Sequence, residues 1–236
     1  GVNCFRVFSS SRSGCFIGLQ GSCTGKERIT VTFTKINRET WSRKEYFDHY
    51  FDQVPCTYSA VFKLDITKLR RSGKKLYPAM LYHISTVVNR HREFRMACLE
   101  GEVGFYDLVH PCYTIFHKET ETFSSLWTAY TPNCEAFCAA YERDLKRWGD
   151  QPGLLSRPDT PENTFPVSML PWASFEGFHL NLQKGYDYLP PIFTMGRFYE
   201  ENGQVLMPLA VQVHHAVCDG FHLCRLVNEL QDCLNA

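Results

Sequence analysis

The fold of this chain depends most on one stretch of sequence, LMPLAVQVHHAVCDG, which covers residues 206–220. Its first eight residues are apolar apart from Gln212, and such a run predicts a buried β-strand. Two histidines, His214 and His215, follow at once, and apolar periodicity resumes only after Gly220. The stretch therefore predicts an imidazole at the end of a core strand, beside a glycine that permits a sharp backbone bend.

On either side of this stretch, strand-like and helix-like segments are interspersed without regular alternation. Helical spacing predicts a short helix around 41–51 after a cap at Thr40 or Ser42, and longer helices over 77–90, 133–148 and 221–234. Strand patterns cover 29–36, 56–66, 94–99, 103–106, 112–117, 165–169, 178–182, 191–199 and 205–213.

The order of these elements indicates the fold class. We expect the strands between 94 and 117 to form an antiparallel meander, and Glu201-Asn202-Gly203 to turn a hairpin. The elements predict an α/β fold of the α+β kind, a two-layer sandwich in which helices pack on a mixed, largely antiparallel sheet.

Composition narrows the class of protein. The 236 residues are 44% hydrophobic, enough for one substantial core, so we expect a single domain over 26–236. Lysine plus arginine equal aspartate plus glutamate at 25 each, which leaves no positive field for nucleic acid or an anionic membrane. No stretch has the roughly 18 apolar residues of a membrane span. Residues 1–25 show neither strand nor helix period and are predicted to be a disordered leader or an artificial or reading-frame extension.

The cysteines indicate the compartment. There are 11, an odd number, and none stands in a Cys-x-x-Cys pair. This pattern argues against a disulfide framework and against a thiolate zinc site. We therefore expect a reducing, cytoplasmic setting and no bound metal.

His215 is the strongest candidate for chemistry. With an ordinary pKa of about 6.5, an imidazole accepts a proton near neutral pH, as a general base does. Two other interpretations remain open from the residues alone: a purely structural histidine, and a metal site built from His214, His215, Asp219 and His222. Adjacent strand residues point to opposite faces, so the two neighbouring histidines would be hard to aim at one ion.

The segment QVHHAVCDGFH at 212–222 resembles the active-site signature of chloramphenicol acetyltransferases. Other segments resemble the same family in the same order: WSRKE at 41–45, PCTY at 55–58, YP at 77–78, EFRMA at 93–97, ETETFS at 119–124, LPW at 170–172 and FTMG at 193–196. The resemblance covers about 26–236 and implies the fold of coenzyme-A-dependent acyltransferases. It also implies direct acetyl transfer from acetyl-CoA, a co-substrate and not a tightly bound cofactor, to the 3-hydroxyl of chloramphenicol, and hence antibiotic resistance.

The resemblance assigns roles by position. His215 would be the general base, Ser168 the donor to the oxyanion, and Thr194 a helper through a bound water. Asp219 would pair with Arg43 and hold the catalytic loop in shape. Further positions would line the acceptor pocket, namely Tyr50, Cys56, Tyr58, Phe123, Phe178, Leu180 and Ile192. The coenzyme channel would be lined by Tyr77, Trp172 and Arg197.

The family also implies a homotrimer, in which pocket residues from the first half of one chain face His215 across a subunit boundary. Three alternatives stay open. The same base could serve another alcohol or, as in the related dihydrolipoyl acyltransferase cores, a thiol. The chain could bind a drug or acyl-CoA without turnover, or it could be a metal-dependent hydrolase.

Overall fold

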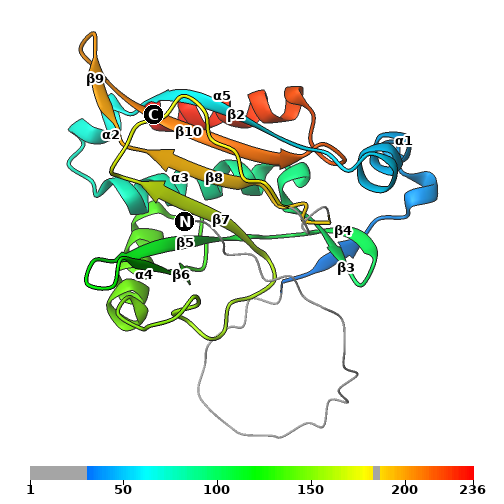
Figure 1. Cartoon of the computed structure of the whole chain (residues 1–236), viewed down its shortest axis with the longest axis horizontal. Helices are drawn as coiled ribbons and strands as arrows, with labels where there is room; N and C mark the ends of the chain where they lie inside the picture. Colours follow the sequence, from blue (N-terminus) through cyan, green and yellow to red (C-terminus); the bar gives the residue numbers. More distant parts are fainter. Residues whose placement is uncertain (1–30, 183–186) are drawn as a thin grey trace, which may run out of the picture.

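The computed structural model describes residues 31–182 and 187–236; the expected leader lies outside them, as does the start of the strand expected at 29–36. Two β-sheets carry the fold (Figure 1). The larger sheet has the strand order β2-β10-β8-β7-β5-β6, and β9 also pairs with β10. Its strands are β2 (Thr57–Asp65), β5 (His110–His117), β6 (Thr122–Trp127), β7 (Thr164–Leu170), β8 (Ile192–Gly196), β9 (Tyr199–Glu201) and β10 (Gln204–His214).

Strand β10 organises the larger sheet. It pairs antiparallel with β2, β8 and β9, and β5 pairs antiparallel with β6. Strand β7 makes parallel pairs with β5 and β8. The sheet is therefore mixed and largely antiparallel, as predicted. The predicted hairpin between β9 and β10 is confirmed, with positive φ at Asn202 and Gly203.

Three helices form the second layer. Helix α3 (Leu76–Arg90) contacts both α4 (Cys134–Trp148) and α5 (Gly220–Asn235), and Figure 1 shows the three on one face of the larger sheet. Alternate residues of β10, Leu209 and Val211, join helical residues such as Ile84 and Leu226 in one buried cluster. The two-layer expectation is confirmed. None of the helices in the described ranges is long and apolar enough to cross a membrane.

Shorter helices lie near both ends of β10, and α1 is beside the end where the two histidines follow (Figure 1). Helix α1 (Lys44–Phe47) continues as a π-helical turn, η2 (Asp48–Gln53), which carries Tyr50. Wide turns of this kind are frequent at functional sites. Arg43 holds the N-cap of α1, so the expected cap at Thr40 or Ser42 is wrong. The remaining short helices are η1 (Arg38–Thr40), α2 (Thr67–Arg71) and η3 (Arg92–Arg95).

Three expectations about strands are wrong. The single strand expected at 191–199 is divided into β8 and β9, because residues 197–198 belong to neither. Residues 178–182 form no strand, because the backbone N–H of Leu180 donates to a side chain, Oε1 of Gln212, at 2.9 Å. The meander is split between the sheets. Strands β3 (Met96–Leu99) and β4 (Glu102–Tyr106) form the smaller sheet with β1 (Phe33–Lys35), in the order β1-β4-β3, whereas β5 belongs to the larger one. Strand β6 and helix α2 were not predicted.

Candidate active site

The imidazole of His215 lies just beyond the end of β10. Its backbone N–H donates to the carbonyl of Cys56 at 2.9 Å, and the N–H groups of Val217 and Cys218 donate back to the carbonyl of His214. The ring stacks on Tyr50, with centroids 3.9 Å apart and planes 12° apart, and meets the ring of Tyr58 edge-on at 5.3 Å. Two aromatic rings therefore fix its orientation, while 29% of the side chain stays exposed.

The carboxylate of Asp219 is directed toward Arg43 and away from a triad arrangement. Its two oxygens accept hydrogen bonds from the guanidinium at 2.6 Å each. Nδ1 of His215 lies 3.3 Å from Oδ1 of Asp219, but among the described residues this buried nitrogen makes no hydrogen bond of acceptable geometry. The hydrogen bonds from Arg43 hold the pKa of Asp219 below the ordinary range of an aspartate.

Arg43 also holds the backbone that carries the imidazole. Its Nε donates to the carbonyl of Ala216 at 2.8 Å, and Nη2 donates to the carbonyl of His215 at 2.9 Å. The hydroxyl of Tyr58 adds a contact to the same turn, since it donates to the carbonyl of Cys218 at 3.2 Å. We call residues 214–219 the catalytic loop from here on.

Ser168 and Thr194 lie together but far from His215 of the same chain. They are paired across the parallel strands β7 and β8, and Thr194 is in turn opposite Ala210 of β10. Ala210 precedes His215 by five residues. Strand spacing of about 4.8 Å and a rise of about 3.3 Å per residue then place the Cα atoms of Ser168 and His215 roughly 19 Å apart.

The residues expected in the acceptor pocket also form two groups, one that contacts His215 and one that lies elsewhere in the chain. Tyr50, Cys56 and Tyr58 contact His215 within one chain, and contacts of first-half residues with His215 across a subunit boundary stay a prediction. Leu180 and Ile192 both lie beside Gln212 of β10, the former through a hydrogen bond and the latter through strand pairing.

The remaining pocket and coenzyme positions lie on several elements: Phe123 on β6, Tyr77 on α3, Trp172 and Phe178 in the segment between β7 and β8, and Arg197 between β8 and β9. Phe178 packs on Phe175, with ring centroids 5.4 Å apart, and Phe123 pairs with Phe116 between β6 and β5. Trp172 is 58% exposed and meets Phe116 edge-on.

Two of the expected coenzyme residues are tied to the backbone. The hydroxyl of Tyr77 lies 3.2 Å from the carbonyl of Thr114 and 3.4 Å from that of Val167, and burial raises its pKa. This hydroxyl is therefore occupied by the protein. The backbone N–H of Arg197 donates to the carbonyl of Ala173, and its side chain is exposed.

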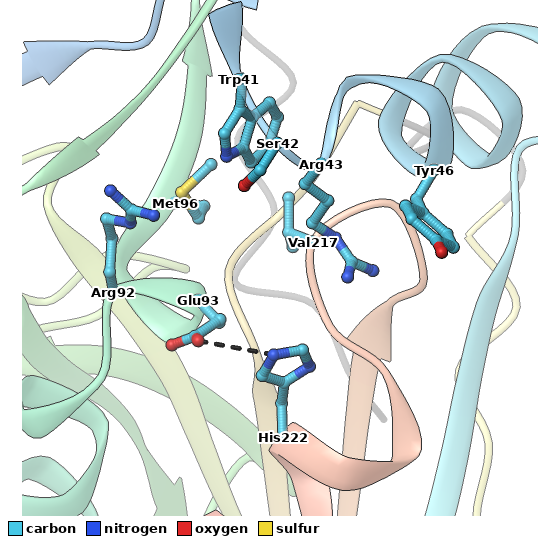
Figure 2. A pocket seen from close by; sticks show the side chains of 9 residues that line it. All are labelled: Trp41, Ser42, Arg43, Tyr46, Arg92, Glu93, Met96, Val217 and His222. Carbon is cyan, nitrogen blue, oxygen red and sulfur yellow. Dashed lines mark ion pairs between the residues drawn. The ribbon is translucent and has the colours of Figure 1, made fainter.

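A cavity of about 300 Å³ opens behind the catalytic loop (Figure 2). His222, Glu93 and Arg43 point into it, and Trp41 and Tyr46 also line it. The sequence did not predict this arrangement. The spacing Asp-x-x-His at a helix start was the one available signal, because the residue three after an N-cap often bonds back to it.

The described part of the structure provides no set of ligands for the metal site considered at the histidine pair. Within residues 31–182 and 187–236, no group of three or more His, Cys, Asp or Glu side chains is placed to hold a metal ion. His222 instead accepts a hydrogen bond at Nδ1 from the backbone N–H of Asp219, at 3.0 Å.

Comparisons with known proteins show which family the chain resembles. A family model described as chloramphenicol acetyltransferase matches residues 31–231. A chloramphenicol acetyltransferase of Campylobacter coli is 60% identical over 206 residues, which cover 87% of this chain and 100% of the relative. One from Clostridium perfringens is 58% identical over 207 residues, again 87% of this chain and 100% of the relative.

Among solved structures, a chloramphenicol acetyltransferase superposes with a TM-score of 0.73 at 22% identity, covering 86% of this chain and 100% of that one. This match supports the fold, and the family model together with the two relatives establishes the family. By both measures, the chain belongs to the chloramphenicol acetyltransferase family.

Proposed function

We propose that this chain transfers an acetyl group from acetyl-CoA to the 3-hydroxyl of chloramphenicol and so confers resistance to the drug. The observation that carries the proposal is the imidazole of His215, oriented by Tyr50 and Tyr58 at the end of β10 while Asp219 is held by Arg43. The relatives that bear the name of this activity match the chain over 87% of its length. Acetyl-CoA is a co-substrate in this scheme, and no tightly bound cofactor is needed.

His215 accepts the proton at the ring nitrogen that is not buried. Because Nδ1 of His215 is buried, Nε2 is the nitrogen that accepts the proton of the drug hydroxyl. The drug oxygen attacks the thioester carbonyl and gives a tetrahedral oxyanion. When the carbon–sulfur bond breaks, the imidazolium returns the proton to the CoA sulfur. The products are the acetyl ester and CoA, with no acetyl-enzyme.

Ser168 and Thr194 serve the oxyanion in this proposal. A hydroxyl placed on a developing oxyanion contributes about 2.7–4 kcal/mol to transition-state stabilisation. Ser168 would donate directly, and Thr194, which is 3% exposed, would act through a bound water. Both lie on the face of the larger sheet opposite the helices, since they share the side of Ala210 and not that of Leu209 and Val211.

The active site requires more than one chain. His215 and Ser168 of one chain are too far apart to touch the same reacting atoms, so we infer that His215 of one subunit acts with Ser168 and Thr194 of the next. A homotrimer with sites at its subunit interfaces satisfies this requirement. Acetyl-CoA as donor and the absence of any Cys-x-x-Cys pair from the sequence favour a cytoplasmic location.

A thiol assay tests the function directly. Released CoA is measured with acetyl-CoA alone and after addition of chloramphenicol, for the parent chain and for His215→Ala. We expect drug-dependent CoA release that falls by at least about a hundredfold in the variant. No stimulation by chloramphenicol, or an unchanged rate in His215→Ala, would remove the assignment.

A further inference from the structure

The catalytic loop has a second anchor besides Arg43, on the side of the cavity in Figure 2. The backbone N–H of Asp219 donates to Nδ1 of His222 at 3.0 Å. A backbone N–H is always a donor, so this contact requires Nδ1 to be unprotonated and places the ring proton on Nε2. Burial lowers the pKa of His222, which favours the same neutral form.

Glu93 lies at the other edge of this ring. Nε2 of His222 lies 3.5 Å from Oε1 of Glu93, the pair drawn with a dashed line in Figure 2. The same carboxylate oxygen accepts from Nη2 of Arg225 at 3.2 Å. Glu93 belongs to η3, which follows α3, so the carboxylate is positioned by an element outside the catalytic loop and α5. The ring of His222 therefore has a hydrogen bond at Nδ1 and a carboxylate oxygen 3.5 Å from Nε2.

These contacts give the catalytic loop two different supports. Arg43 holds carbonyl oxygens, those of His215 and Ala216, and the carboxylate of Asp219. His222 holds the N–H at the end of the loop, where Asp219 caps α5. In a usual capping box this position is a flexible Glu or Gln, and a rigid imidazole fixes the separation more strictly.

We propose that His222, supported by Glu93, is a positioning residue for acetyl transfer, which sets the place of His215 through the backbone N–H of Asp219. The inference rests on the proposed function. It gives a role to His222 and Glu93, which contact neither His215 nor the residues assigned to substrate binding. A displacement of about 1 Å at a reacting group costs on the order of a hundredfold in rate, so a support of this kind is worth a measurable part of kcat.

Two substitutions of His222 distinguish an effect on the position of His215 from an effect on the stability of the protein. His222→Gln keeps an acceptor that reaches back to the N-cap N–H, as in a usual capping box, whereas His222→Leu removes the acceptor. The cavity beside the ring leaves room for either side chain. Ser42→Ala, which alters the same cavity from the α1 side, is the matched control.

The measurement is kcat and KM for both substrates at a temperature well below the unfolding midpoint of every variant, with circular dichroism to confirm folding. We expect His222→Leu to lower kcat about tenfold or more while both KM values change less than about twofold, and His222→Gln to recover most of the rate. Ser42→Ala should match the parent.

Two outcomes overturn the inference. One is a folded His222→Leu protein with the parent kcat. The other is a His222→Gln protein that is as stable as the parent but as slow as His222→Leu, since a restored acceptor would then have no effect on rate. A parent chain without drug-dependent CoA release is a different result, because it would refute the proposed function before any variant is compared.

Discussion

At the level of single residues, Arg43 connects the carboxylate of Asp219 with two carbonyls of the catalytic loop. Asp219→Asn removes the charge and one strong acceptor, so we expect about 1–2 kcal/mol less unfolding free energy together with a lower kcat. Urea unfolding and the thiol assay measure the two effects on one sample. A variant as stable as the parent but selectively slow would instead support direct acid–base work by Asp219.

Tyr58 offers a second test at this scale. Tyr58→Phe keeps the ring that meets His215 and removes the hydroxyl that donates to the carbonyl of Cys218. The lost hydrogen bond should lower the unfolding free energy by about 1 kcal/mol and reduce kcat severalfold. Tyr58→Leu, which also loses the ring contact, is the comparison. Equal kcat values for the two variants would show that the hydroxyl alone is responsible for the effect. A Tyr58→Phe variant with the kcat of the parent would show that the hydroxyl has no effect.

The sequence, through the family resemblance, predicted these residues and the pairing of Asp219 with Arg43, but not the contacts that other side chains make to the backbone of the catalytic loop. His215, Asp219 and Arg43 are in segments whose order and composition resemble the family, so they were found. The contacts of Tyr58 and His222 go to backbone groups of the catalytic loop, and such contacts leave no pattern in side-chain chemistry. The position of Tyr50 depends on a π-helical turn, which helical spacing does not distinguish from an α-helix.

At the level of elements, a buried histidine couples stability to pH. His110 of β5 is 5% exposed, and its Nδ1 accepts from the backbone N–H of Tyr130 at 3.0 Å. Burial lowers its pKa to about 4, below the ordinary value of 6.5, so the folded chain prefers the neutral ring. Its full contribution is present above about pH 6.5 and is lost as the pH falls toward 4, by roughly 3 kcal/mol at most.

This dependence can be isolated with His110→Asn, whose Oδ1 can accept the same N–H but does not titrate in this range. We expect the unfolding free energy of the parent, from urea titrations, to fall more steeply between pH 6.5 and 4.5 than that of the variant. Parallel slopes would mean that His110 is not the group responsible.

Most elements were predictable because their periodicity is strong. The three long helices and β10 have long apolar patterns, and their boundaries were found to within a few residues. Strand β6 was missed because half of its residues, Thr122, Ser124 and Ser125, are polar, and it is an edge strand that buries only part of its length. Residues 178–182 look strand-like, but Gln212 takes the place of a neighbouring strand as their hydrogen-bond partner. Side-chain competition of this kind is invisible in an alternating pattern.

At the level of the whole molecule, the proposed assembly can be tested by mixing two defective subunits. His215→Ala chains retain Ser168, and Ser168→Ala chains retain His215. If each site takes the base from one subunit and the oxyanion donor from the next, random trimers from an equal mixture should regain about a quarter of the parent activity. Each variant alone should lie at least about a hundredfold below the parent.

The mixing is done by denaturation and joint refolding, with separately refolded variants combined afterwards as the control. Activity that stays at the level of the separate variants would place base and oxyanion donor in one chain, against the distance between β7 and the end of β10. The sequence predicted the two-layer fold of one chain, but it could not predict which residues stay apart within that chain. That separation depends on strand order, and strand order follows from packing between segments remote in the sequence.

The distance between His215 and Ser168 has a consequence for the cell. In the proposed assembly, a newly synthesised subunit has the general base but no complete active site. It therefore cannot catalyse hydrolysis of acetyl-CoA before it joins other subunits. Harmful thioester hydrolysis is then prevented by geometry alone, and the level of resistance should rise more steeply than the level of expression while subunits are scarce.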